Sequence, residues 1–123
     1  MSYLTIFVVG TLASLALAQD ASADPSARIQ VSDIKPLLIR AIDQGAAHGL
    51  LVGEAAAYVR QKFESSAPIE IDVRTLYALP QPGCSRLEVT TRQKDVLEKA
   101  KRGDKELTYQ VSYCRDGRFP EKR

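Results

Sequence analysis

The spacing of apolar residues changes from a helical period to a strand period along this chain. In the first half, the apolar residues Ile34, Leu37, Leu38 and Ala41 recur at i, i+3, i+4 and i+7, which places them on one face of a helix. Ser32 is a good N-cap for this helix, and Pro36 is tolerated only in its first turn. We therefore predict a helix that starts near Ser32.

A second helix is predicted from about residue 50 to residue 63. Its apolar side chains form a row at i+4 spacing: Leu51, Ala55, Val59 and Phe63. Gly45 and Gly49 interrupt the pattern before it and favour a tight connection between two helices. One continuous helix across residues 32–64 also fits, so the sequence leaves open whether there are one or two helices.

From Pro68 onward apolar and polar residues alternate, which is typical of half-buried strands. Three such segments are predicted, with their apolar residues at 69–73, 87–91 and 107–113. Residues 94–105, between the last two segments, are highly charged, and we predict a loop or a short helix there.

The N-terminus predicts export. Residues 1–18 carry no charged side chain, and Ala16-Leu17-Ala18 fits the small-x-small pattern of a signal peptidase site. The apolar run is shorter than the roughly 20 residues that a membrane span needs. We predict a signal peptide over 1–18, a flexible leader over 19–30 and a single domain over 31–123. Because no Lys or Arg precedes the apolar run, a retained membrane anchor and a buried core helix remain alternatives.

Cys84 and Cys114 are the only cysteines, and an even pair in an exported chain predicts a disulfide. If the last two strands pair antiparallel with Cys84 opposite Cys114, the same register pairs Leu87 with Val111 and Val89 with Tyr109. One register thus satisfies both the disulfide and the apolar face. The predicted fold class is α+β: one or two helices packed on a three-stranded antiparallel sheet with one disulfide.

Composition and motifs identify no reaction. The net charge of +2 gives no reason to expect specific nucleic-acid binding. His48, the only histidine, lacks an evident nucleophile and is predicted to be exposed or to cap a helix. Glu70 and Asp72 share a strand face, where Arg74 and arginines of the next strand are expected to balance them. We expect no catalytic residues, no metal site, no cofactor and no small-molecule substrate.

The C-terminal part of the chain is basic, which fits either an ordinary solvated face or a surface that binds a partner. Residues 84–123 contain 11 basic and 7 acidic side chains, a net charge of +4. We select a candidate partner-binding patch from this part: Arg92, Lys105, Arg115, Arg118 and Phe119. Phe119 either folds back onto the sheet beside the disulfide or stays exposed as a docking point. The triplet Arg102-Gly103-Asp104 is interpreted as a turn between charged residues.

Two segments carry a resemblance. Leu79-Pro-Gln-Pro-Gly-Cys-Ser-Arg-Leu-Glu-Val-Thr-Thr-Arg-Gln93 and Tyr113-Cys-Arg-Asp-Gly-Arg-Phe-Pro120 resemble small exported proteins encoded by conjugative plasmids and integrative conjugative elements. The resemblance covers roughly residues 45–120 and brings no known active site. It implies a Gram-negative periplasm and a non-enzymatic accessory role beside a type IV secretion apparatus.

The expected function is therefore a periplasmic accessory or binding protein that contacts a protein partner in the cell envelope, in connection with conjugative DNA transfer. A small inhibitor or immunity-type protein that binds an envelope enzyme is the alternative. A hydrolase based on His48 is the third hypothesis. Membrane association is expected only through an uncleaved signal.

Overall fold

The computed structural model describes residue 10 and residues 27–121. Apart from residue 10, the predicted signal peptide lies outside the described residues, as do residues 19–26 of the predicted leader. Among the described residues, no helix is both long enough and apolar enough to cross a membrane.

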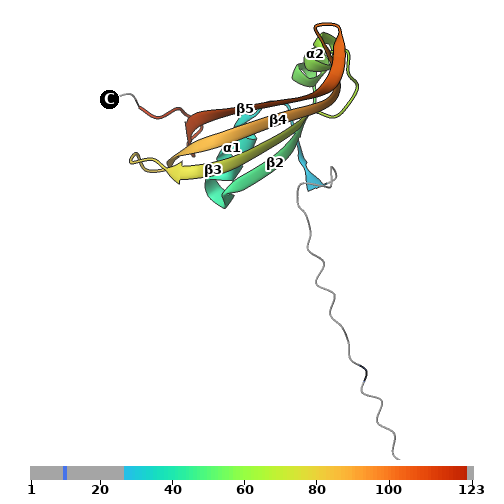
Figure 1. Cartoon of the computed structure of the whole chain (residues 1–123). Coiled ribbons are helices and arrows are strands. Elements are labelled where there is room, and N and C mark those ends of the chain that lie inside the picture. Colours follow the sequence, from blue (N-terminus) through green and yellow to red (C-terminus); the bar gives the residue numbers. More distant parts are fainter. Residues whose placement is uncertain (1–9, 11–26, 122–123) are drawn as a thin grey trace, which may run out of the picture.

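The described chain has two helices and five strands, and its last three elements are all strands. In chain order they are β1 (Ile29–Val31), α1 (Lys35–Gln44), β2 (Ala46–Leu51), α2 (Glu54–Lys62), β3 (Glu70–Ala78), β4 (Cys84–Glu98) and β5 (Lys101–Cys114). The strands form one sheet in the order β1-β2-β3-β4-β5, in which only the β1–β2 pair is parallel (Figure 1). The α+β class is confirmed, but the sheet has five strands rather than the predicted three.

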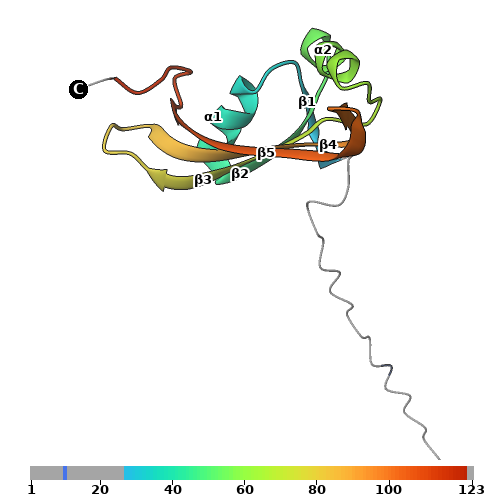
Figure 2. The same cartoon turned by 45° about the horizontal axis from the view of Figure 1, so that its top comes forward.

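Both helices lie on the same side of the sheet, which gives the domain two layers (Figure 2). The core between the layers is built from α1 and the inner strands, with these buried residues: Leu37, Leu38, Ala41, Ala47, Ile71, Val73, Leu87 and Val89. We call this side of the sheet the helix-covered face and the other side the open face. By contrast, Ala56 is the only buried residue of α2, so α2 contributes little to the core.

The predicted register of the last two strands is confirmed. Cys84 lies opposite Cys114, and the Leu87–Val111 and Val89–Tyr109 pairs follow in the same antiparallel register. The disulfide is present, with 3.9 Å between the two Cα atoms. Since side chains alternate along a strand, it lies on the face opposite Leu87 and Val89.

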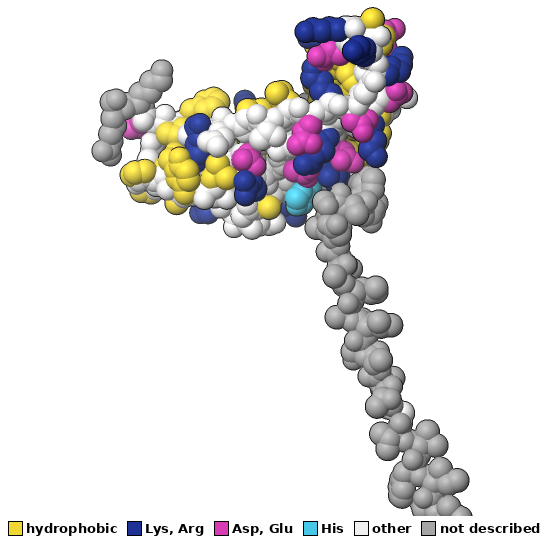
Figure 3. All heavy atoms as spheres, in the orientation of Figure 1, with side chains coloured by type: hydrophobic (Ala, Val, Ile, Leu, Met, Phe, Trp, Pro, Cys, Tyr) yellow, Lys and Arg dark blue, Asp and Glu magenta, His cyan; other side chains and the backbone are white. Residues whose placement is uncertain are grey.

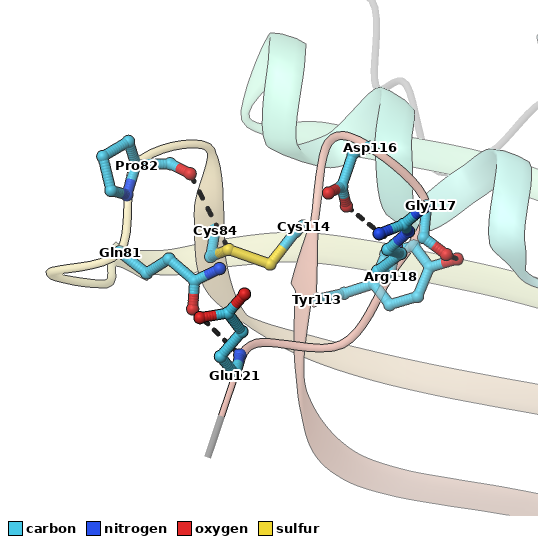
Figure 4. The surroundings of a disulfide bond; sticks show 9 residues. All are labelled: Gln81, Pro82, Cys84, Tyr113, Cys114, Asp116, Gly117, Arg118 and Glu121. Carbon is cyan, nitrogen blue, oxygen red and sulfur yellow. Dashed lines mark hydrogen bonds between the residues drawn. A yellow bond between two sulfur atoms is a disulfide. The ribbon is translucent and has the colours of Figure 1, made fainter. Parts of the chain in front are cut away.

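Both cysteines are buried although they lie on the open face, and the C-terminal segment runs beside the disulfide (Figure 4). The backbone N–H of Glu121 donates to Oε1 of Gln81 at 2.9 Å, and the Tyr113 hydroxyl donates to the carbonyl of Gly117 at 2.8 Å. The cross-link therefore ties the β3–β4 turn, the end of β5 and the C-terminal segment together.

The first helix is confirmed on its predicted face, but it starts later than Ser32. Its first residue is Lys35, whose backbone N–H donates to Oδ1 of Asp33 at 2.8 Å, and Pro36 lies in the first turn as expected. The second helix is shorter than predicted as well, because α2 covers only Glu54–Lys62. The chain thus has two helices, not one continuous helix.

The predicted helix–helix connection at 45–49 is wrong, because these residues enter strand β2. Gly45 ends α1 with a positive φ of 90°. Gly49 has a packing role instead: a Cβ there would lie 2.7 Å from Cδ1 of Leu37 and 3.0 Å from the carbonyl oxygen of Ile29. The glycine therefore lets α1 and β1 approach the middle of β2.

The predicted loop or short helix at 94–105 is also wrong, since β4 and β5 continue through it to a two-residue turn. Lys99 and Ala100 both have positive φ angles, 52° and 64°, as a type I′ hairpin turn requires. Asp95, with a φ of 53°, lies at an irregularity in the strand pairing between Gln93 and Val96. Most side chains of this part of the hairpin are exposed, so a strand can carry charges on both faces.

The folded domain begins before residue 31, inside the segment predicted to be a flexible leader. Ile29–Val31 form β1, and the side chain of Arg28 is only 1% exposed. β1 pairs in parallel with β2, with Ile29 opposite Gly49.

We expect the double substitution Cys84→Ser/Cys114→Ser to lower the free energy of unfolding by roughly 3–4 kcal/mol, because the bond closes a loop of about 30 residues. Urea denaturation followed by circular dichroism, with the wild-type chain as reference, measures the difference. An unchanged unfolding midpoint would contradict the cross-linking role assigned to this bond.

Candidate functional site

A cluster of charged side chains on the open face is centred on Asp72. Oδ1 of Asp72 accepts hydrogen bonds from Nη1 of Arg28 at 2.8 Å and lies 2.6 Å from Nδ1 of His48. Oδ2 accepts a hydrogen bond from Nη1 of Arg92 at 2.6 Å. Acidic and basic side chains alternate beside the histidine on this face (Figure 3). One carboxylate thus joins three cationic or potentially cationic groups.

Strand register explains why these residues meet. His48 on β2 is the cross-strand partner of Asp72 on β3, and Arg92 on β4 is the partner of Glu70, two residues earlier on β3. Arg28 directly precedes β1, and its side chain reaches the cluster from there. It donates to the carbonyl oxygens of Gly49 and Ile71 at 3.4 Å as well as to Asp72.

The cluster holds Asp72 ionised. Burial disfavours the charged carboxylate, but the hydrogen bonds from Arg28 and His48 outweigh burial and keep the pKa of Asp72 below its ordinary value. An ionised Asp72 in turn compensates the buried guanidinium of Arg28. The arrangement therefore stabilises the junction of β1, β2 and β3.

The same contacts show what this cluster lacks as a catalytic site. A histidine–carboxylate pair can act as a general base only when a nucleophile or substrate proton lies within reach. His48 is half-exposed and hydrogen-bonds Asp72, and no hydroxyl or thiol of residues 27–121 is hydrogen-bonded to its ring. Within the same residues, no group of three His, Cys, Asp or Glu side chains is placed to hold a metal ion.

The structure refines the sequence-based expectations for this face. His48 is half-exposed, but it lies within a strand and does not cap a helix. Arg92 balances Asp72, as expected, whereas Arg74 bonds Glu88 instead, with 2.8 Å between Nε and Oε1. The sequence did not identify Arg28, because nothing in its local pattern indicates that a residue of an apparent leader is buried.

The candidate patch selected from charge does not form one surface. Arg115, Arg118 and Phe119 lie together near the disulfide, where Nε of Arg115 is 2.5 Å from Oδ1 of Asp43 on α1. Arg92 lies on the open face and bonds both Asp72 and Glu106. Lys105 bonds Glu98 in the distal part of the hairpin, about 30 Å along β5 from the disulfide at ~3.4 Å per residue.

Phe119 satisfies both of the alternatives left open by the sequence. Its ring packs edge-on against the ring of Tyr113, with 5.4 Å between centroids, so it does fold back beside the disulfide. Its side chain is nevertheless 67% exposed. The triplet at Arg102–Asp104, interpreted as a turn, belongs instead to strand β5.

An apolar groove of about 500 Å³ lies on the helix-covered face. Its floor is formed by residues of the sheet and its wall by α2 and the residue after it, with Ile71, Thr91, Leu107 and Tyr109 in the floor and Ala55, Val59 and Phe63 in the wall. Leu107 is 56% exposed and Tyr109 is 42% exposed. A second hollow, of about 540 Å³, flanks α1, but charged side chains border it: Asp33, Lys35, Arg40 and Asp43.

The groove exists because α2 is held at one end of the sheet. The backbone N–H of Leu97 on β4 donates to the carbonyl of Phe63 at 2.8 Å, just after α2. The hydroxyl of Ser65 donates to the carbonyl of Lys94 at 2.7 Å, and Nε2 of Gln93 donates to the carbonyl of Ala67 at 3.1 Å. These bonds fix the segment that follows α2, and the floor between α1 and α2 stays open.

Two ammonium groups lie beside the aromatic end of the groove. Nζ of Lys105 is 4.6 Å from the centroid of the Phe63 ring, and Nζ of Lys62 is 5.6 Å from it. In the floor, burial raises the pKa of the Tyr109 hydroxyl above its ordinary value. The groove is thus apolar along its floor, with two ammonium groups at one end, of which that of Lys105 is paired with Glu98.

The sequence predicts the components of the groove but not the groove itself. All four members of the predicted apolar row of the second helix line it: Leu51, Ala55, Val59 and Phe63. Their spacing predicts a shared apolar face. It does not tell whether that face is buried or open.

No known protein family, characterised protein or solved structure matches this chain.

We expect Asp72→Asn to destabilise the domain at pH 7 by on the order of 3 kcal/mol, because it leaves the buried guanidinium of Arg28 undercompensated. It should also change the response to acid. Since the pKa of Asp72 is lower in the folded state, the unfolded state binds more protons in the window below pH ~4, and the stabilisation is lost as pH falls through it.

Urea denaturation between pH 2 and pH 7 measures both effects, with Asp43→Asn as the control because Asp43 forms a solvent-exposed pair with Arg115. We expect the control to keep the wild-type slope of stability against pH. Equal slopes in Asp72→Asn and Asp43→Asn would contradict the role assigned to the Asp72 cluster.

Proposed function

We propose that this chain is an exported, non-enzymatic accessory protein that binds a protein partner in the cell envelope through the apolar groove. The observation that carries the proposal is the groove floor, where Leu107 and Tyr109 remain exposed at 56% and 42%. Burying a large apolar side chain fully contributes about 1.5–3 kcal/mol, so these residues offer binding free energy that the fold itself leaves unused.

The open face offers a partner less. Its principal charged groups already form ion pairs within the chain, as Asp72 does with Arg28 and Arg92 and Glu88 does with Arg74. A partner would have to replace these pairs before it gained new ones. Exposed ion pairs also contribute little net free energy. This comparison favours the groove over the basic patch that the sequence suggested.

The groove favours a partner segment of defined chemistry. Apolar side chains fit its floor and the wall formed by Ala55 and Val59. An acidic side chain fits the end at Phe63 beside the ammonium group of Lys62, because that of Lys105 is already paired with Glu98. We therefore propose that the partner presents apolar residues followed by a carboxylate.

The compartment and the process rest on other observations. An intramolecular disulfide is typical of an oxidising compartment such as the periplasm. The two segments that resemble proteins of conjugative elements meet at this disulfide, where the N–H of Arg115 donates to the carbonyl of Gly83 at 2.8 Å. Both observations favour a periplasmic protein that serves conjugative transfer.

We expect Ala55→Trp, which fills the groove from an exposed position on α2, to abolish the accessory role without unfolding the domain. Ala57→Trp is the matched control, because Ala57 is exposed on the same helix but does not line the groove. The measurement is conjugative transfer frequency in a host whose gene is deleted and then restored in trans with the wild-type or variant sequence.

The proposal expects deletion to lower transfer, and wild-type and Ala57→Trp to restore it while Ala55→Trp does not. Envelope levels of each variant, compared by immunoblotting, exclude differences in folding or export. Full restoration by Ala55→Trp would exclude the groove as the contact surface. An unchanged frequency after deletion would exclude the role in transfer.

A further inference from the structure

Strand β5 is one edge of the sheet, and its hydrogen-bonding pattern shows which of its backbone groups have no partner among residues 27–121. In an antiparallel pair, alternate residues direct both backbone groups toward the neighbouring strand. Cys84 directs its groups away from β5, since its N–H donates to the carbonyl of Gln81 and its carbonyl accepts from Leu79. Cys114 is the cross-strand partner of Cys84, so its backbone N–H and carbonyl also point away from β4. The same holds for every second residue of β5 counted from Cys114.

The C-terminal segment occupies only the last of these outward positions. The N–H of Cys114 donates to the carbonyl of Arg118 at 2.9 Å, and its carbonyl accepts from the N–H of Gly117 at 3.0 Å. The register is uninterrupted between Lys105 and Cys114, so four more residues direct their backbone N–H and carbonyl groups outward, to the free edge: Glu106, Thr108, Gln110 and Ser112.

This free edge lacks the features that normally prevent strand pairing. Exposed edges are usually protected by lysines, prolines, bulges or short length. The segment Glu106–Ser112 contains no lysine, arginine or proline, and its register with β4 is regular. Glu106 is its only charged residue. The opposite edge of the sheet, β1, has only 3 residues.

We propose that Glu106–Ser112 pairs antiparallel with the same segment of a second copy of this chain, about a two-fold axis at Tyr109. This register pairs Glu106 with Ser112 and Thr108 with Gln110 of the other copy, so every outward backbone group of the segment finds a partner. Shifting the two-fold axis to Thr108 or Gln110 leaves outward groups at one end of the segment unpaired. The free segment is thus self-complementary in one register.

Side chains on both faces fit this pairing. On the helix-covered face, Leu107 meets Val111 of the second copy, and the two Tyr109 side chains meet at the axis. These are the aromatic and β-branched pairs that stabilise neighbouring strands. Their contact would cover the sides of Leu107 and Tyr109 that face the edge, while their sides in the groove floor would stay open to a partner.

On the open face the pairing is complementary in charge. Nη1 of Arg86 donates to the hydroxyl of Ser112 at 3.0 Å, so this guanidinium lies at the position that Glu106 of the second copy would face. Glu106 is already paired with Arg92 of its own chain. In the dimer the carboxylate of Glu106 would lie between the guanidinium groups of its own Arg92 and of Arg86 of the second copy. No two side chains of like charge within Glu106–Ser112 would face each other in this register.

The dimer goes beyond the proposed function and extends the surface that this function uses. Joining the two edges produces a ten-stranded sheet with the four helices on one side. The two groove floors then form one apolar surface across the two-fold axis. A partner with two apolar segments could occupy both grooves at once.

Sedimentation equilibrium of the disulfide-bonded protein purified from the periplasm tests the proposal. We expect the wild-type chain to dimerise, and Tyr109→Lys to raise the dimer dissociation constant about tenfold or more, because it places two ammonium groups opposite each other at the axis. Tyr77→Lys is the matched control, since Tyr77 is an exposed tyrosine on the inner strand β3. It should leave the constant unchanged.

Two further variants test the edge and the register. Thr108→Pro removes an outward N–H but no bond to β4, a position that an edge strand tolerates, and it should also weaken the dimer. Tyr109→Cys should form a cross-linked dimer on a non-reducing gel, because the two positions would form a closely spaced cross-strand pair. Gln110→Cys should not cross-link. Ala55→Trp should still dimerise, which separates this test from that of the groove.

A wild-type chain that stays monomeric at 100 μM would overturn the proposal. So would a dimer that survives both Tyr109→Lys and Thr108→Pro. A dimer in which Gln110→Cys cross-links and Tyr109→Cys does not would overturn the register.

Discussion

The pairing of β4 with β5, cross-linked with Cys84 opposite Cys114, is the constraint on which the rest of the structure depends. Because side chains alternate along each strand, this register directs Leu87 and Val89 toward α1 and directs Arg86 and Glu88 to the open face. A slip of one residue would exchange the two sets and bury charged side chains beneath the helix. The disulfide excludes such a slip, since it forms in one register only. The division between an apolar and a charged face, and hence both candidate sites, follows from it.

The groove is the consequence of a long hairpin and short helices. α1 has 10 residues and is therefore about 15 Å long at ~1.5 Å per residue, whereas β5 has 14 residues and extends about 48 Å at ~3.4 Å per residue. One helix cannot cover such a hairpin. α2 lies at its far end, where the N–H of Leu97 donates to the carbonyl of Phe63 and the hydroxyl of Ser65 donates to the carbonyl of Lys94. The floor between the helices has apolar residues in phase with the core but no helix above it.

Local patterns in the sequence predicted the parts of the fold whose cause is itself local. Period and register gave α1, β3 and the β4–β5 pairing, because alternation and one covalent bond suffice to define them. They missed β2, since the role of Gly49 depends on Leu37 and Ile29 approaching from elsewhere in the chain. They missed the distal hairpin because charged residues are compatible with a strand only when both faces meet water. Arg28 was missed for the same reason as β2: its partners lie 21 to 44 residues away in sequence.

The same distinction explains why charge in the sequence pointed to a different surface from the structure. Arg92, Lys105 and Arg115 are conspicuous in a list of residues, but each is paired with a carboxylate of its own chain. A charge that is already neutralised at short range adds little attraction for a distant partner. The apolar residues of β5 are the reverse case, because the helices that could bury them are too short to reach. The free energy available for binding therefore lies where the fold leaves contacts unmade, and the groove and the edge beside it are such places.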